Sequence, residues 1–186
     1  MPKSVREAFT LIELLIVVTI VGILAALALP RIRSAQFDAD TGMHTVQVVL
    51  QQAQRAAILR QTDVMVSFDT AGKRIRVVYD INNNHQYDPG EAMSWAPLDD
   101  GTRFVVPPSG VQMAGGAPVV GSSLSSRDNY PTVYYHRDGA LSSELELYVT
   151  SHRADLTDER AIHVRQATGR VQLYRYNGSA WIGAGL

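Results

Sequence analysis

The first third of the chain separates into an apolar stem and an amphipathic continuation. Residues 9–29 read FTLIELLIVVTIVGILAALAL, an almost unbroken apolar run with one carboxylate, Glu13. As an α-helix this run would be roughly 30 Å long, which matches the hydrocarbon thickness of a bilayer. From residue 30 the pattern becomes amphipathic, which predicts one helix from about 9 to about 61 with a bend at Pro30. The residues expected to face a domain core are Val46, Val49, Leu50, Ala53, Ala56 and Ala57.

From residue 62 the hydrophobic period changes to two, which predicts β-strands. Val64, Val66 and Phe68 alternate with more polar neighbours, and Ala71-Gly72 is a turn before a return strand at 74–79. Residues 107–131 are rich in Gly, Ser and Pro and are interpreted as a long loop. The order of elements predicts an α+β fold, with a long kinked helix packed on an antiparallel β-sheet head domain. Further strands are expected at 103–106, 132–136, 144–149, 161–165, 171–176 and 180–182.

Composition narrows the function classes. The 186 residues carry a formal net charge of -1, so no global field favours nucleic acid or a basic partner. There is no cysteine, which excludes disulfides, thiolate metal sites and cysteine nucleophiles. The chain is long enough for the stem and one head domain of ordinary size.

Three interpretations of the stem compete. Lys3 and Arg6 before the apolar run, with small residues near its end, loosely fit a cleaved secretory signal. The length and the flanking charges also fit a plain membrane anchor whose N-terminus stays cytoplasmic. Both leave Glu13 without a role, and an acid inside a membrane costs about 2.5–3.5 kcal/mol. An acid near a helix start also favours the helix dipole, which is the structural alternative for Glu13.

A third interpretation explains the acid. The string Ala8-Phe9-Thr10-Leu11-Ile12-Glu13-Leu14 closely resembles the processing site of type IV prepilins and type II secretion pseudopilins. The resemblance implies cleavage between Ala8 and Phe9 by a prepilin peptidase, which also N-methylates Phe9. It implies that Glu13 pairs with the new amino terminus of an adjacent subunit, which neutralises two charges in an apolar setting. Family members usually carry Gly before the cut, where this chain has Ala8.

The resemblance also implies an organisation and a location. Residues 1–8 would be the leader peptide and 9–29 the transmembrane and filament-core helix. Residues 30–61 would be an amphipathic helix packed on the head, and 62–186 a periplasmic β-rich head domain. The chain would cross the inner membrane once with its N-terminus in the cytoplasm. It would join other pilin or pseudopilin subunits through the N-terminal helix.

Two short motifs in the head resemble the GspH/FimT branch of minor pseudopilins. These are Tyr135-His136-Arg137-Asp138-Gly139 and Thr168-Gly169-Arg170-Val171, the second followed by Trp181. The branch implies a minor pseudopilin of a type II protein secretion system or a minor type IV pilin. Such a subunit is structural and has no catalytic activity.

A twelve-residue stretch at 80–91 matches the spacing of a calcium loop. Oxygen-bearing side chains stand at positions 1, 3, 5, 9 and 12, and position 7 can offer a backbone carbonyl. Position 6, which is usually Gly, is His85, a residue type that tolerates positive φ. A hydrated hairpin shaped by Asx turns is an equal alternative. The predicted calcium ligands are Asp80, Asn82, Asn84, Gln86, Asp88 and Glu91.

Enzymatic and nucleic-acid-binding functions are the remaining alternatives. The five histidines have no metal-ligand spacing, and the chain has no nucleophile elbow or phosphate loop, so we expect no catalysis. Some members of the FimT side serve DNA uptake through basic residues of the C-terminal part of the head. Arg165, Arg170 and Arg175 lie near aromatic residues, which is the composition that phosphates and bases favour. A DNA-binding minor pilin is therefore the alternative function.

Overall fold

The chain forms two compact units, Met1–Ser34 and Ala35–Leu186. The computed structural model describes residues 10–113, 117–118 and 126–184, with side chains described at 10–25, 35–113 and 127–184. One helix, α1 (Leu11–Arg60), belongs partly to each unit. The expected bend at Pro30 falls among side chains outside the described residues, so it stays a prediction.

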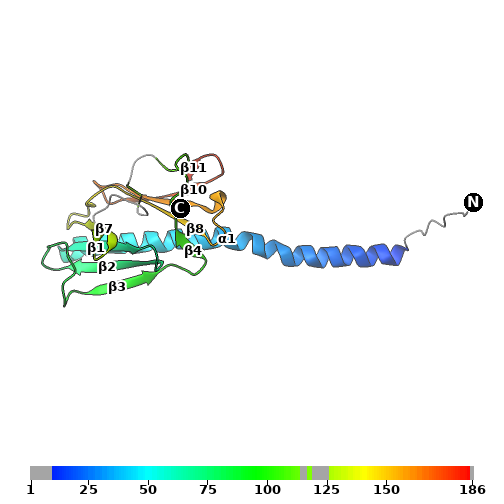
Figure 1. Cartoon of the computed structure of the whole chain (residues 1–186), viewed down its shortest axis with the longest axis horizontal. Helices are drawn as coiled ribbons and strands as arrows, with labels where there is room; N and C mark the ends of the chain where they lie inside the picture. The colour runs from blue at the N-terminus through cyan, green and yellow to red at the C-terminus, as the bar shows by residue number, and fades with distance from the viewer. Residues whose placement is uncertain (1–9, 114–116, 119–125, 185–186) are drawn as a thin grey trace, which may run out of the picture. The chain divides into compact units, whose positions relative to one another are not determined.

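The second unit contains two sheets (Figure 1). The first is antiparallel with the order β3-β2-β1-β7-β6. It pairs β1 with β7 across a long stretch of sequence, with Val66 opposite Val133. Its strands are β1 (Asp63–Asp69), β2 (Arg74–Asp80), β3 (Met93–Pro97), β6 (Ser126–Arg127) and β7 (Tyr130–Tyr135).

The second sheet has the order β11-β10-β9-β8-β4, and the short β5 pairs with β8 in parallel. A single 3-10 turn, η1 (Leu156–Asp158), connects β8 to β9. The strands are β4 (Thr102–Phe104), β5 (Ala117–Pro118), β8 (Leu145–Ser151), β9 (Arg160–Val164), β10 (Val171–Tyr176) and β11 (Trp181–Gly183).

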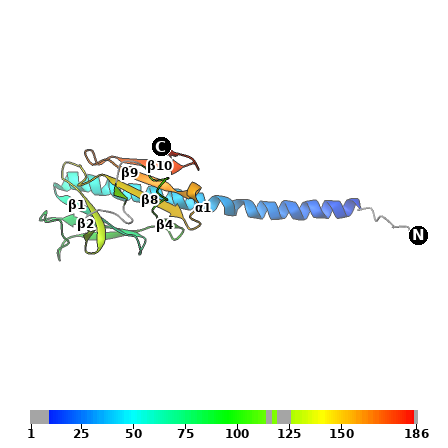
Figure 2. The same ribbon diagram turned by 45° about the horizontal axis from the view of Figure 1, so that its top comes forward.

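The core lies where the C-terminal part of α1 meets both sheets. In Figures 1 and 2, β2 of the first sheet and β10 of the second lie on different sides of α1. The predicted apolar face of the helix is confirmed, because five of its six residues are buried and Ala56 packs against the same cluster. Each buried aliphatic side chain removes enough surface from water to contribute about 1.5–3 kcal/mol. The strands contribute Val66, Phe68, Leu147, Val149 and Ile162 to this core.

The α+β expectation is confirmed, with several differences. The stretch 107–131, interpreted as a long loop, contains the two-residue strands β5 and β6, and β7 begins at its end. Strand β3 was not predicted, because it is a short edge strand that ends at Pro97 and carries few β-branched residues. The alternation of apolar and polar residues in β1 predicts one face in the core and one exposed face, yet all seven residues are buried. On the second side of β1, His85 contacts Asp63 and the guanidinium of Arg76 donates to Ser67.

Candidate functional site

The stem helix presents apolar side chains in every direction. From Leu11 to Leu24, every Leu, Ile and Val side chain is at least half exposed, with exposed fractions of 50–84%. A helix that is apolar all round is stable only where it is covered by lipid or by other protein. Among the described residues, no helix combines the length and the hydropathy needed to cross a membrane. The predicted span at 9–29 includes Phe9 and the side chains of 26–29, which lie outside the described residues.

Glu13 stands in the first turn of α1, and Thr10 caps that turn. The amide N–H of Glu13 donates to the Oγ1 of Thr10 at 3.3 Å and to its carbonyl oxygen at 3.1 Å. Thr10 and Glu13 thus have the spacing of a capping box, which is readable from the sequence. The carboxylate of Glu13 is exposed and lies where a positive partner can reach it. The predicted cleavage and methylation site, Ala8 and Phe9, lies outside the described residues.

The predicted calcium loop joins β2 to β3 and closes on itself through hydrogen bonds. Buried Asp80 accepts from the backbone N–H groups of Asn84 and His85, at 3.1 and 2.7 Å. Asp88 Oδ2 accepts from the side-chain amides of Asn82 and Asn84, at 2.8 and 2.6 Å. The two carboxylate oxygens of Glu91 accept from the N–H groups of Ile81 and Asp88. The N–H of Gln86 donates to Asn84 Oδ1.

This loop therefore already has the hydrogen bonds of an Asx-rich turn. Within the described part of the chain, no three His, Asp or Glu side chains are placed so that they could hold a metal ion. The calcium ligands stay a prediction.

His85 explains why the loop departs from the usual glycine at its sixth position. The residue has a φ of 59°, in the left-handed region that was expected there. Its ring stacks on Tyr134 with centroids 3.9 Å apart, and its Nε2 lies 3.0 Å from Asp63 Oδ2. The Nδ1 of His136 lies 3.2 Å from the same oxygen. With Nε2–H on His85 and Nδ1–H on His136, both rings donate to one buried carboxylate.

No local pattern predicts this cluster, because His85 and His136 are far apart in the chain. Asp63 is 4% exposed, and its Oδ1 has no hydrogen-bond partner among the described atoms. The cluster joins the loop, the start of β1 and the end of β7. It is best interpreted as the contact that docks the loop on the first sheet.

The three arginines of the predicted DNA surface do not form one patch. Arg165 and Arg170 meet at the β9–β10 turn, where the N–H of Arg165 donates to the carbonyl of Arg170. Arg175 lies at the other end of β10, opposite Arg160 and Ile182. Arg160 itself is buried and binds Asp40 of α1 at 2.5 Å, so it holds the sheet to the helix.

The nearby aromatic rings are used for packing. Tyr176 is buried, and Trp181 lies between Tyr148 and Tyr176 with ring centroids 5.5 and 5.3 Å away. The indole N–H of Trp181 donates to the carbonyl of Val111. These rings are not free to stack on bases, so this arrangement does not favour the DNA-binding alternative.

The two head motifs, 135–139 and 168–171, both contact Gln54 of α1. Gln54 of α1 donates through Nε2 to the carbonyls of Gly139 at 2.9 Å and Thr168 at 2.8 Å. Gly169 has a φ of +60°, and a Cβ there would lie 2.2 Å from the carbonyl oxygen of Gly139. Tyr135 is buried beside this contact, and burial raises the pKa of its phenol. The motifs therefore serve to join both sheets to the helix.

One buried acid has a carboxylate oxygen without a hydrogen-bond partner among the described atoms. Glu159 is 3% exposed, and its Oε2 has no hydrogen-bond partner among the described atoms. Burial raises the pKa of this carboxyl from 4.5 to about 7. We therefore expect the stability of the head domain to depend on pH.

Comparison with known proteins agrees with this architecture of an apolar N-terminal helix and a β-rich head. Residues 3–29 match the family model of the prokaryotic N-terminal methylation motif. Residues 43–169 match the model of the type II transport protein GspH. The chain belongs to the GspH family.

Individual relatives are more distant. The chain is 34% identical over 87 residues to the pilin-like protein PilA1 of Thermus thermophilus, a match that covers 46% of this chain and 56% of that protein. Its fold is similar to that of the minor pseudopilin EpsH from the type 2 secretion system of Vibrio cholerae. The TM-score is 0.50 at 11% identity, over 74% of this chain and 97% of that one.

Proposed function

We propose that this chain is a structural subunit of a pseudopilus of the type II protein secretion system or of a type IV pilus. The observation that carries the proposal is the stem, whose described apolar residues are exposed on all sides, while the head buries its own core. None of the described stem residues, 10–25, belongs to the hydrophobic core of the head. The stem is suited to lie first in lipid and then among the stems of other subunits.

The N-terminal processing follows from the same proposal. A prepilin peptidase would cut between Ala8 and Phe9 and methylate the amino group of Phe9, which keeps its positive charge. Glu13 would pair with that group on a neighbouring subunit. Support comes from the match of residues 3–29 to the methylation motif and from the exposure of Glu13 in the first helical turn.

The location also follows. The stem would anchor the chain in the inner membrane with its N-terminus in the cytoplasm, and the head would lie in the periplasm. The subunit would act as a building block without turnover, because its polar clusters hold loops and sheets together. Its partners would be the processing peptidase and other pilin or pseudopilin subunits.

The role of Glu13 can be tested by separating membrane insertion from assembly. We expect Glu13→Ala to reach the membrane fraction at the normal level, because it removes an acid from an apolar helix. Its incorporation into filaments should fall at least about tenfold, because the amino terminus of the neighbour loses its partner. Glu13→Asp is the matched control, since it keeps the carboxylate. Normal assembly of Glu13→Ala would refute the pairing.

A further inference from the structure

A hollow of about 280 Å³ lies on the head domain where α1, η1 and the β10–β11 turn come together. Its lining combines charged and neutral side chains that can donate hydrogen bonds with the apolar Ile182 of β11. The described residues that line it include no Asp or Glu. The donors are Gln36 of α1, Thr157 of η1, Arg160 of β9, Arg175 of β10 and Asn177 of the turn.

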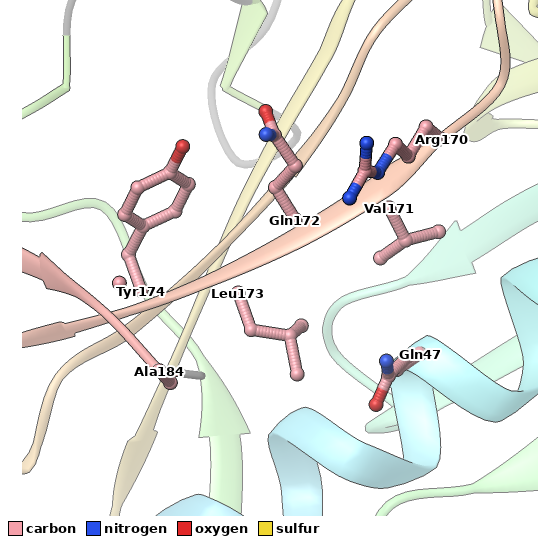
Figure 3. Close-up of a pocket in the computed structure, with 8 residues that line it drawn as sticks. Gln47, Arg170, Val171, Gln172, Leu173, Tyr174 and Ala184 are labelled. Carbon is pink, nitrogen blue, oxygen red and sulfur yellow. The ribbon is translucent and has the colours of Figure 1, made fainter. Parts of the chain in front are cut away.

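Two arginines on neighbouring strands face this hollow. Figure 3 shows Val171 and Leu173 of β10 projecting towards α1, while Gln172 projects to the opposite side of the strand. Because side chains alternate along a strand, Arg175 lies on the same face as Leu173. The β9–β10 register places Arg160 directly opposite Arg175. Like charges at directly opposed positions repel each other, so this pair favours an anion between or beside the two guanidinium groups.

The described part of the chain supplies a carboxylate to only one of the two arginines. The Nε of Arg160 donates to Asp40 at 2.5 Å, and its Nη1 donates to the carbonyls of Thr157 and Glu159 at 3.0 and 3.1 Å. Arg160 is 1% exposed, yet its Nη2 has no hydrogen-bond partner among the described residues. Arg175 is exposed, and no described carboxylate lies within 4.0 Å of it. One positive charge and one donor of a buried guanidinium are therefore left for a ligand.

Neutral donors complete the hollow. The Oδ1 of Asn177 accepts from the N–H groups of Ser179 and Ala180, at 2.9 and 2.8 Å, and from the hydroxyl of Ser179 at 2.9 Å. These bonds fix the amide and leave its Nδ2 as a donor without a partner in the described part of the chain. Gln36 and Thr157 are exposed on the other sides. Donors that come from four elements suit a tetrahedral oxyanion, which has acceptor oxygens in several directions, better than a planar carboxylate.

We propose that this hollow binds a phosphate group, held by the guanidinium groups of Arg160 and Arg175 and by the side-chain amide of Asn177. Free phosphate is one source of such a group. The headgroup of an anionic phospholipid is the other, because Gln36 is only the seventh residue after Leu29, the end of the apolar run. This second source rests on the proposed function, since it requires the stem to lie in a membrane. The phosphate site itself does not.

The test titrates the full chain in a non-ionic detergent with sodium phosphate at constant ionic strength. Heteronuclear NMR follows the side-chain N–H resonances of Arg175 and Asn177, and we expect both to shift and to saturate. A second titration uses mixed micelles of the same detergent with phosphatidylglycerol, and micelles with a diacylglycerol, which lacks phosphate, are its control. Saturation in either titration supports the site, and the tighter of the two identifies the source of the phosphate.

Variants assign the binding to this hollow. Arg175→Gln should weaken phosphate binding about tenfold, because it removes the charge and keeps a donor. Arg165→Gln is the matched control, since this exposed arginine lies at the β9–β10 turn and does not line the hollow. Asn177→Asp keeps an acceptor for Ser179 and Ala180 but adds a negative charge, so it should weaken binding at least about tenfold. An unchanged melting temperature of each variant would show that the fold is intact.

Several results would overturn the proposal. These are no saturable shift in either titration, an equal loss of binding in Arg165→Gln, and binding of acetate as tight as that of phosphate. Tighter binding of a thymidine oligonucleotide that depends on Arg175 would assign the hollow to nucleic acid instead. The phosphate titration requires neither membrane nor filament, so its failure leaves the proposed function intact. Failed processing or assembly in cells would count against the proposed function and not against the phosphate site.

Discussion

At the scale of single residues, three positions of the head domain show how a side chain, or its absence, is fixed by its neighbours. His85 stands where calcium loops usually have glycine, and its ring reaches Asp63 and Tyr134. Gly169 has no side chain because the carbonyl of Gly139 occupies the space. Glu159 is different, since it is buried without a hydrogen-bond partner for Oε2 among the described atoms. Its cost should appear as a pH dependence.

The pKa of Glu159 is raised by burial from 4.5 to about 7, so folding favours the neutral acid. The stabilisation is complete below pH 4.5 and is lost as the pH rises to 7, and the loss amounts to about 2–3 kcal/mol. Glu159→Gln keeps the shape without the charge. We expect it to remove this part of the pH dependence and to unfold at higher urea concentration at pH 8.

The measurement is the free energy of unfolding of the full chain in detergent at pH 4.5, 6 and 8, followed by tryptophan fluorescence. Asp100→Asn, a change at an exposed acid of the same head domain, is the control and should leave the pH dependence unchanged. Parallel pH curves for the wild type and Glu159→Gln would show that this acid carries no cost.

At the scale of elements, the β2–β3 loop is stabilised by hydrogen bonds within itself and by a contact with the first sheet. Its own amides satisfy Asp80, Asp88 and Glu91, and His85 docks it on the first sheet. To bind calcium, these carboxylates would have to give up their hydrogen bonds from amide groups and coordinate the cation. The asparagine side chains would have to turn their oxygens towards it. The loop is anchored without the ion, so calcium would add rigidity without being required for folding.

This distinction can be measured by thermal unfolding of the full chain in calcium and in chelator. If the ligand prediction is right, calcium raises the melting temperature by several degrees, and Asp88→Ala removes the rise. Asp138→Ala, at an acid outside the loop, is the control and should leave the rise intact. A melting temperature that is the same in calcium and chelator would refute the calcium ligands.

At the scale of the whole molecule, local patterns were predicted and long-range contacts were not. The stem, the apolar face of α1 and most strands follow from hydrophobic periodicity, because each depends on neighbours within a few residues. The pairing of β1 with β7, the meeting of His85 with His136 and the clamp at Gln54 depend on residues far apart in sequence. No local signal identifies these contacts. The arginines of β9 and β10 lie close in sequence, yet strand geometry separates Arg175 from the other two.

The central claim is that the stem is processed and retained for assembly, and the mature amino terminus tests it most directly. Mass spectrometry of the chain purified from the membrane of its native host should find N-methyl-Phe9 as the first residue. An intact Met1, or a cut after Ala28, would contradict the account, because the first leaves the leader in place and the second removes the stem.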